Sequence, residues 1–241
     1  MRSSCGPLIE GFLQLILPST CAACTCLCDE GAAFCEPCGA TLDPVLRACP
    51  RCALPLGGEG DRSECLGCLR APPPWASAIA PYVFGAALAQ AVRAWKLGAR
   101  QALAGGLGAA LAPSLSSLAP GVDALVPVPL HPRRLRARGF NQAFDLARSA
   151  SRRAGPRAPG VADLLDRVRD TPPQATLDRA GRRDNVRGAF RVRGRWDVIG
   201  AHLCLIDDVM TTGATLAACA EALQEAGAAR VDVLTLARAL P

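Results

Sequence analysis

The stretch Leu203-Cys204-Leu205-Ile206-Asp207-Asp208-Val209-Met210-Thr211-Thr212-Gly213-Ala214-Thr215 decides the fold of this 241-residue chain. Its apolar first half is typical of a strand buried on both faces, and the Ala- and Leu-rich segment 214–226 indicates a helix. Another apolar strand is expected at 231–236. Strand, tight turn, helix and strand make a βαβ unit, so the predicted fold class is α/β with a parallel sheet.

The turn between this strand and helix carries the chemistry of a site. Asp207 and Asp208 leave the strand at the carboxyl edge of the sheet, where open α/β sheets bind ligands. Segment 211–215 offers hydroxyls and backbone N–H groups at a helix N-terminus, and Gly213 permits close approach of an anion. Carboxylates suit sugar hydroxyls and the loop suits phosphate, which predicts a ribose 5-phosphate ligand. The alternative is an acidic turn that only caps the helix.

We expect both carboxylates to be accessible to solvent without ligand. Two adjacent acids repel each other, so ligand hydroxyls or a metal-bound water would compensate them. Upstream, alternating patterns predict further elements: strands at 79–84 and 122–129, and helices at 86–97, 101–111 and 141–153. The Pro- and Arg-rich segment 155–185 predicts a loop.

Thirteen cysteines mark a second module, because eleven of them precede residue 70. They include four C-x-x-C pairs: Cys21/Cys24, Cys35/Cys38, Cys49/Cys52 and Cys65/Cys68. Two such knuckles complete a tetrahedral Cys₄ site, so we predict two structural Zn²⁺ ions. Sequential pairing is the simplest arrangement, and crossed pairing stays open. Cys26 and Cys28 crowd the first site, for which we favour Cys21 and Cys24. Cys204 and Cys219 are expected to be small core residues.

The run Ala71-Pro-Pro-Pro-Trp75 is a stiff extended segment between the two modules. We therefore expect residues 1–75 to hold a short helix at 8–17 and the double zinc ribbon, and residues 76–241 to hold the ligand-binding domain. No apolar run is long enough to span a membrane. Paired cysteines without an export signal favour a reducing compartment, and we expect the cytoplasm.

Charge is concentrated in the middle of the chain. Residues 133–195 contain 17 Arg and 6 acidic residues, a balance of +11, whereas the whole chain carries +6. A basic segment of this kind suggests an anionic ligand such as phosphate or nucleic acid. Lys96 is the only lysine, and the preference for Arg by itself says nothing about recognition.

The acidic turn and its loop resemble the 5-phosphoribosyl 1-pyrophosphate (PRPP) signature of type I phosphoribosyltransferases. By this resemblance Asp207 and Asp208 face the ribose hydroxyls and act as the catalytic carboxylates. The residues that enclose the 5′-phosphate are Thr211, Thr212, Gly213, Ala214 and Thr215. The resemblance implies a type I phosphoribosyltransferase-like fold that uses Mg²⁺ together with PRPP.

Further blocks of sequence resemble the ComF family of competence-associated, phosphoribosyltransferase-like proteins. These blocks are Val126-Pro-Val-Pro-Leu-His131, Arg133-Arg134, Arg138-Gly-Phe-Asn-Gln142, Ala94-Trp-Lys96, and the stretch from Gln174 through Arg182-Arg-Asp-Asn185 to Ala189-Phe190. The four C-x-x-C pairs also look like the double zinc ribbon of that family. The resemblance covers nearly the whole chain.

In the wider enzyme fold, the turn after the first core strand holds pyrophosphate. The candidate pyrophosphate-binding residues are therefore Leu130, His131, Arg133, Arg134 and Lys96. For several residues two interpretations remain open. Lys96 either reaches a phosphate or lies along the surface, and His131 either takes part in acid–base chemistry or is merely solvated. Asn141 and Gln142 either cap a helix or point at ligand.

Two functions follow from the resemblance. The first is transfer of ribose 5-phosphate from PRPP to a nitrogen nucleophile, with the basic loop 166–185 as a lid that excludes water. The second is a non-catalytic competence factor that binds single-stranded DNA and proteins of the competence machinery, regulated by PRPP or a nucleotide. Single-strand grooves combine charge with stacking aromatics. Segment 133–195 supplies only Phe140, Phe144 and Phe190, which equally suit a core.

Overall fold

The computed structural model describes residues 20–29, 32–57, 63–97, 102–118, 121–170, 186–194 and 197–240. The helix expected at 8–17 lies outside the described residues, and so do residues 171–185 of the expected lid. Within the described ranges, no helix has the length and apolar character needed to cross a membrane.

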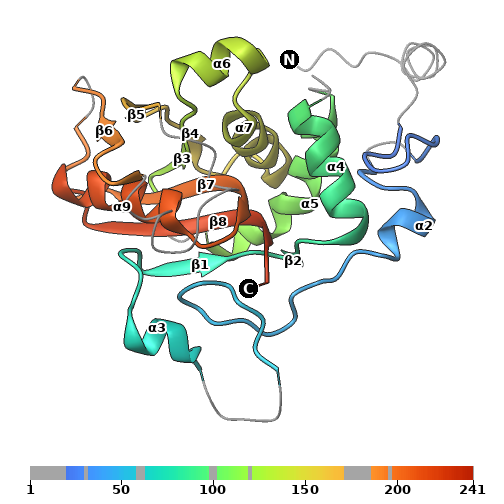
Figure 1. The fold of residues 1–241 in the computed structure, drawn as a ribbon, viewed down its shortest axis with the longest axis horizontal. Helices are drawn as coiled ribbons and strands as arrows, with labels where there is room; N and C mark the ends of the chain where they lie inside the picture. The colour runs from blue at the N-terminus through green and yellow to red at the C-terminus, as the bar shows by residue number, and fades with distance from the viewer. Residues whose placement is uncertain are drawn as a thin grey trace.

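A parallel sheet forms the centre of the molecule (Figure 1). Its strands are β1 (Ser77–Ile79), β2 (Tyr82–Val83), β3 (Ala124–Pro127), β4 (Gly160–Val161), β7 (His202–Met210) and β8 (Arg230–Arg238). Their order is β1-β8-β7-β3-β4, with β2 also paired to β8, and all of these pairings are parallel. Parallel pairing brings the carboxyl ends of β3, β7 and β8 to one edge, which is where the site lies.

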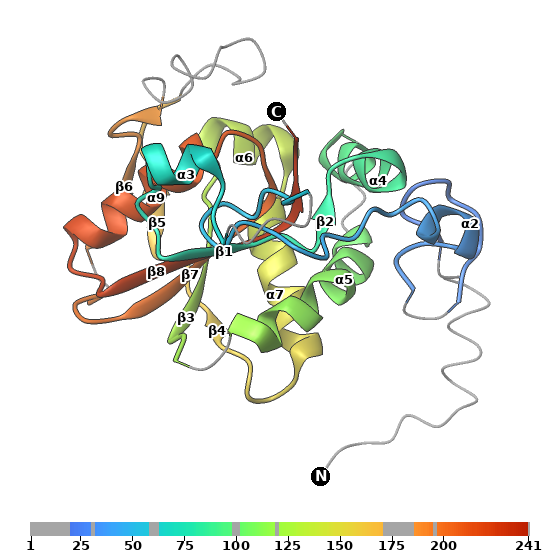
Figure 2. The same cartoon turned by 90° about the horizontal axis from the view of Figure 1, so that it is seen from below.

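Helices cover both faces of this sheet, which explains the nearly continuous apolar sequence of β7. Leu203 and Leu205 pack into the core beneath α9 (Ala214–Glu225), whereas Cys204 and Ile206 face the opposite core. That second core is built with α4 (Ala86–Leu97), α5 (Leu103–Leu118) and α7 (Gln142–Ala154). Figure 2 shows these three helices on one side of the sheet and α9 on the other. The predicted α/β fold class is confirmed.

Most predicted elements occur within a few residues of their expected bounds, with four differences. The loop expected at 155–185 contains the short strands β4 and β5 (Leu165–Arg167) in its described part. The strand expected at 79–84 is divided into β1 and β2, because Pro81 between them has no N–H to donate to a ladder. The helix expected at 101–111 continues to Leu118 as α5. The basic run after β3 is a helix, α6 (Pro132–Arg138), and not a loop.

A small antiparallel pair and two short helices complete the description. β5 (Leu165–Arg167) pairs with β6 (Phe190–Val192), and β6 packs near α9. The N-terminal cysteines flank α2 (Glu36–Gly39) and α3 (Leu66–Arg70). In Figure 1 α2 lies beyond α4 and α5, whereas α3 lies on the side of α9 and β1. The two cysteine-rich ribbons therefore contact different parts of the sheet domain.

Candidate functional site

The loop between β7 and α9 has the conformation that the sequence predicts for anion binding. Gly213 is the N-cap of α9 and adopts a left-handed conformation with φ of 77°. A Cβ atom at this position would lie 3.0 Å from the Trp75 ring, so both backbone conformation and packing require glycine. The Thr212 hydroxyl accepts a hydrogen bond of 3.4 Å from the amide of Ala214. The loop thus presents the start of a twelve-residue helix to the sheet edge.

The two carboxylates lie at the end of β7, but they are not both accessible to solvent as expected. Asp208 is only 5% exposed. Its Oδ2 atom lies 2.7 Å from Nζ of Lys96 on α4, and its Oδ1 atom accepts a hydrogen bond from the amide of Val209. Asp207 is half-buried and accepts a hydrogen bond from the amide of Asp208. The expectation fails because an α4 cation already compensates Asp208.

Asp207 is the carboxyl group with a raised pKa at this edge of the sheet. Burial, together with the negative charge of Asp208, raises the pKa of Asp207 to about 7, while Lys96 acts in the opposite direction. A carboxyl group with this pKa is partly protonated near neutral pH. A ligand that donates hydroxyl groups, or a cation, would therefore favour its ionised form.

The candidate pyrophosphate residues lie partly on α6. Pro132 is the first residue of this helix, and His131 is its N-cap, because Nδ1 of His131 accepts a hydrogen bond from the amide of Arg133. Asp170 lies 3.6 Å from both His131 and Arg133 and 4.0 Å from Arg134. The turn expected to hold pyrophosphate is therefore the beginning of α6. Its basic side chains lie around the exposed carboxylate of Asp170.

Asn141 and Gln142 have structural partners. The Asn141 side chain accepts a hydrogen bond from the Ala143 amide and donates one to the Val128 carbonyl, so it caps α7 and ties the helix to the end of β3. Gln142 accepts a hydrogen bond of 2.7 Å from Arg138. Burial lowers the pKa of Arg138, although the negative charge of Asp208 opposes this effect.

These side chains surround a cavity of about 410 Å³. The predicted site residues that line it are Lys96, Leu130, Arg134, Asp207, Asp208, Thr211, Gly213, Ala214 and Thr215. His131, Arg133 and Thr212 are not among the lining residues. The cavity thus brings the acidic pair, the loop and part of the basic set together.

Two arginines that line the cavity had no role in the predicted site. Arg138 begins the Arg138-Gly-Phe-Asn-Gln142 motif, but the sequence alone did not indicate that it belongs to the site. Arg167 on β5 is 7% exposed, and its guanidinium lies over the Phe190 ring at 5.3 Å from the centroid. Burial lowers the pKa of Arg167. Nothing in the local sequence distinguishes Arg167 from the many other arginines of the basic segment.

The paired cysteines form two clusters in the sequential arrangement. Their members are Cys21, Cys24, Cys35 and Cys38 in the first, and Cys49, Cys52, Cys65 and Cys68 in the second. Within each cluster all sulfur atoms lie within 4.8 Å of one another. The Cys24–Cys35 and Cys52–Cys65 sulfur distances are 3.5 and 3.6 Å. A tetrahedral zinc site with Zn–S bonds of about 2.3 Å needs sulfur separations of about 3.8 Å, so both clusters fit structural Zn²⁺.

The other cysteines of the described residues stand outside these clusters. Cys26 is exposed, and the Cys28 sulfur contacts the Ala32 carbonyl at 3.6 Å. Cys204 and Cys219 are buried in the sheet and in α9, where burial raises the pKa of both thiols. They are core residues, as the sequence predicted.

The fold and the cysteine clusters define the class of this protein: it is an α/β protein with a parallel central sheet and two N-terminal Cys₄ clusters. No family model matches the sequence. DNA utilization protein YhgH of Salmonella typhi is 32% identical over 233 residues, which cover 94% of this chain and 100% of that protein. Competence protein F of Haemophilus influenzae is 35% identical over 118 residues, which cover 48% of this chain and 51% of that protein. The chain belongs to the ComF family, as its sequence motifs predicted.

Two solved structures also show a partial similarity. One is described as the allosteric regulatory enzyme of purine biosynthesis, with 21% identity and a TM-score of 0.36 over 56% of this chain. The other is the glutamine PRPP amidotransferase of B. subtilis, with 22% identity and a TM-score of 0.37 over 57% of this chain. In both cases the match covers 26% of the other chain.

Proposed function

We propose that this protein binds PRPP in the cavity at the carboxyl edge of the sheet and either transfers or senses its ribose 5-phosphate unit. The observation that carries the proposal is the adjacency of the Gly213 loop and the Asp207–Asp208 pair at the end of β7. One ribose 5-phosphate carries both a phosphate and vicinal hydroxyls. It can therefore occupy the helix N-terminus and the carboxylates together.

Each part of the cavity has a role in this proposal. Residues 211–215 hold the 5′-phosphate with hydroxyls and amides, and the carboxylates of Asp207 and Asp208 accept hydrogen bonds from the ribose hydroxyls. Arg134 and Arg138, which line the same cavity, lie on the side proposed for the pyrophosphate. Carboxylate oxygens are also ligands that Mg²⁺ accepts, and the carboxylate of Asp207 is partly exposed at this edge of the sheet. Bound Mg²⁺ would neutralise charge on the diphosphate.

In the transfer reaction, the bond from C1′ to the pyrophosphate oxygen breaks and a bond from C1′ to an acceptor nitrogen forms. Pyrophosphate leaves with the electron pair, and the acceptor nitrogen gives up one proton. The protein's contribution is to fix the sugar between loop and carboxylates and to surround the leaving group with arginines. In the sensing function the same contacts bind PRPP and no acceptor enters.

Calorimetric titration of the full chain with PRPP and Mg²⁺ tests binding. A screen of nitrogen bases for pyrophosphate release then separates transfer from sensing, because release with one acceptor establishes transfer. Asp197→Asn is a matched control, since Asp197 is an exposed carboxylate outside the cavity. Wild type and Asp197→Asn should bind PRPP alike. Absence of binding in the wild type would refute the proposal.

The names of the relatives favour a connection with the use or uptake of DNA, and we propose single-stranded DNA as a second ligand. Arg133 and Arg136 on α6 are exposed and available to a phosphate backbone. In contrast, Phe140 and Phe190 are each only 6% exposed, so neither offers a stacking surface. Binding should therefore depend mainly on charge and weaken strongly with salt.

The test of DNA binding is a salt series on an oligonucleotide of mixed sequence. Arg133→Glu with Arg136→Glu should abolish binding, whereas Arg153→Glu at the end of α7 should reduce it little. Affinity that is independent of salt, or unchanged in the α6 variant, would exclude this function. If the protein takes part in the use of DNA, we propose that its protein partners belong to the competence machinery.

A further inference from the structure

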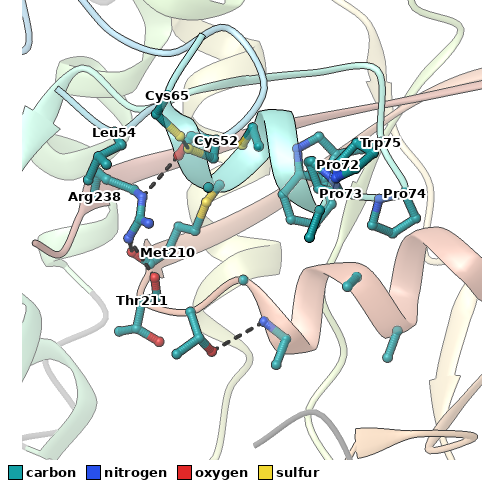
Figure 3. A pocket seen from close by; sticks show the side chains of 18 of the residues that line it. Cys52, Leu54, Cys65, Pro72, Pro73, Pro74, Trp75, Met210, Thr211 and Arg238 are labelled. Carbon is teal, nitrogen blue, oxygen red and sulfur yellow. Dashed lines mark hydrogen bonds between the residues drawn. The ribbon is translucent and has the colours of Figure 1, made fainter. Parts of the chain in front are cut away.

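The outer side of the Gly213 loop faces the second Cys₄ ribbon, and Arg238 connects the two. A groove of about 1640 Å³ separates α3 from α9. It is lined on one side by cysteines of the second Cys₄ cluster and on the other side by residues 210–214 of the loop. Figure 3 shows Cys52 and Cys65 on one side of this groove and Met210 and Thr211 on the other, with Arg238 between them. The loop that is proposed to hold phosphate is therefore supported from behind by a metal-binding segment.

Arg238 makes the direct connection. It is the last residue of β8 and is 8% exposed. Its Nε atom donates a hydrogen bond of 2.9 Å to the carbonyl of Cys52, a residue of the second cluster. Its Nη1 atom donates to the carbonyls of Met210 and Thr211 at 3.0 and 2.5 Å. A single planar guanidinium thus links a zinc knuckle to the first peptides of the loop.

The peptide geometry gives this link a consequence for ligand binding. In a trans peptide the C=O and the following N–H point in opposite directions. When Arg238 holds the carbonyls of Met210 and Thr211, the amides of Thr211 and Thr212 are directed away from Arg238. Thr211 also lines the cavity on the other side of the loop, where phosphate is proposed to bind. Arg238 therefore fixes the orientation of the Thr211 amide, whose residue lines the cavity.

Trp75 provides a second connection between the ribbon and the loop. Its indole N–H donates a hydrogen bond of 2.5 Å to the carbonyl of Arg51, which lies inside the Cys49–Cys52 knuckle. The Trp75 ring packs against Gly213, and Trp75 is 4% exposed. Arg51 in turn donates to the carbonyls of Pro73 and Ala76, both at 3.1 Å. The knuckle and the aromatic ring beneath the loop therefore form one hydrogen-bonded unit.

The first Cys₄ ribbon has no comparable contact among the described residues. Its Ala22 is buried in the core that contains α4 and α5, and Ala33 lies against Gly106 of α5. Figure 2 shows α2 of this ribbon far from α3 and α9. The chain thus provides its own control, because two zinc sites of the same type differ in their relation to the loop.

We propose that Zn²⁺ in the second Cys₄ site positions the phosphate loop through Arg238 and Trp75, so that this metal and the loop ligand bind cooperatively. Zinc knuckles of this kind are ordered only when metal is bound, and loss of the metal would release the Cys52 carbonyl from Arg238. Coupling is reciprocal, so the ligand must also retain the metal. The effect of the second zinc on the order of the loop does not depend on PRPP. The effect of ligand on zinc retention rests on the proposed PRPP binding.

Amide hydrogen exchange without ligand tests the positioning role. Cys35→Ser with Cys38→Ser gives a protein that keeps zinc only in the second site. Exchange in segment 210–216 should match wild type while that zinc is present, and should become at least about tenfold faster when a chelator removes it. Segment 203–206 inside β7 should stay protected. Unchanged exchange at 210–216 after removal of the second zinc would overturn the proposal.

Arg238→Lys tests the link without touching a cysteine. Lysine keeps the charge but cannot span three carbonyls with a planar fork. The variant should retain two zinc ions and show faster exchange at 210–216, whereas the control Arg153→Lys, an exposed residue of α7, should behave as wild type. Identical exchange in Arg238→Lys and Arg153→Lys would refute a role for Arg238.

The coupling to ligand is measured as the rate at which a chelator removes zinc. PRPP with Mg²⁺ should slow release from the second site by about fivefold or more and leave the first site unchanged. In Arg238→Lys this protection should disappear. If calorimetry shows binding but the second site is not protected, the cooperativity is wrong. If PRPP does not bind at all, the proposed function fails, and the exchange experiment still decides the positioning role.

Discussion

Nζ of Lys96 on α4 lies 2.7 Å from Oδ2 of Asp208 on β7. The lysine side chain is 34% exposed, whereas that of Asp208 is only 7% exposed. The only lysine of the sequence therefore serves as the counter-charge of a nearly buried acid at the candidate ligand site. A cation in this position lets the chain keep two adjacent carboxylates at the sheet edge without a ligand.

Lys96→Met should destabilise the fold. The substitution leaves the Asp208 carboxylate buried beside Asp207 without its cation, at a cost of about 2 kcal/mol. Urea unfolding at pH 7 measures the loss. The double variant Lys96→Met with Asp208→Asn should recover part of it, because the uncompensated charge is then absent. Additive effects of the two substitutions would show that the ion pair contributes nothing.

Asp208→Asn should weaken PRPP binding by more than about tenfold, or about 1.4 kcal/mol, because a charge-assisted hydrogen bond to a ribose hydroxyl is lost. Its effect on stability should be small. Asparagine still accepts from the Val209 amide and relieves repulsion with Asp207, while Lys96 can reach water. Calorimetry and thermal melting measure both quantities. Wild-type affinity, or a large fall in melting temperature, would identify the acidic turn as a structural cap.

Asp207→Asn should stabilise the unliganded protein at alkaline pH. The pKa of Asp207 is raised from its ordinary value of 3.8 to about 7. Ionisation of Asp207 thus favours the unfolded state, and wild-type stability declines as pH rises from about 4 to 7. The variant lacks this decline, so its advantage should be absent at pH 4 and should reach at most about 4 kcal/mol at pH 8. A difference independent of pH in urea unfolding would argue against the raised pKa.

Thr212→Ala should distinguish phosphate recognition from sugar recognition. The hydroxyl lies at the start of α9 and does not line the unliganded cavity, because it accepts a hydrogen bond from the Ala214 amide. It is proposed to exchange this partner for the 5′-phosphate when ligand binds, so PRPP should bind the variant at least about fivefold more weakly. Free ribosides, which lack the phosphate, should lose little affinity. Parallel titrations of one variant with both ligand types supply the control. An equal loss for both would place Thr212 in general support of the loop.

The purified protein should contain close to two zinc ions, since two Cys₄ clusters fit tetrahedral sites. Cys35→Ser with Cys38→Ser should remove one metal and leave PRPP affinity largely intact, because the first ribbon packs against α4 and α5. Metal analysis and calorimetry check the two statements. A single zinc in the wild type would contradict the first of them.

Hydrophobic patterns in the sequence predicted those strands and helices whose residues are fixed by burial along one segment. The apolar run of β7 indicated burial on both faces, and the bounds of α4 at 86–97 matched the expected helix. The α6 helix was missed although signals were present. Pro132 stands at its start, and Gly139 with φ of 84° follows its end, which is the usual pattern of helix limits.

The relationships that the sequence did not predict join distant positions. Arg238 and Cys52 are 186 positions apart, and no periodicity connects them. No periodicity connects Lys96 with Asp208 either. For Lys96 the sequence left two other roles open, contact with a phosphate or a position along the surface. Both arginine and lysine have long side chains whose partners depend on tertiary packing. The adjacency of the acidic pair and the Gly213 loop was therefore predictable, but the compensation of charge between Lys96 and Asp208 was not.

The position of β8 has a consequence for the order in which the chain folds during translation. β8 lies between β7 and β1, and Ser77 of β1 pairs with Asp232, which the ribosome adds 155 residues later. Until β8 emerges, β1 lacks its partner strand, and the carbonyls of Cys52 and Met210 lack their hydrogen bonds to Arg238. Zinc can enter the ribbons early in synthesis, but the loop is held in place only after β8 has left the exit tunnel.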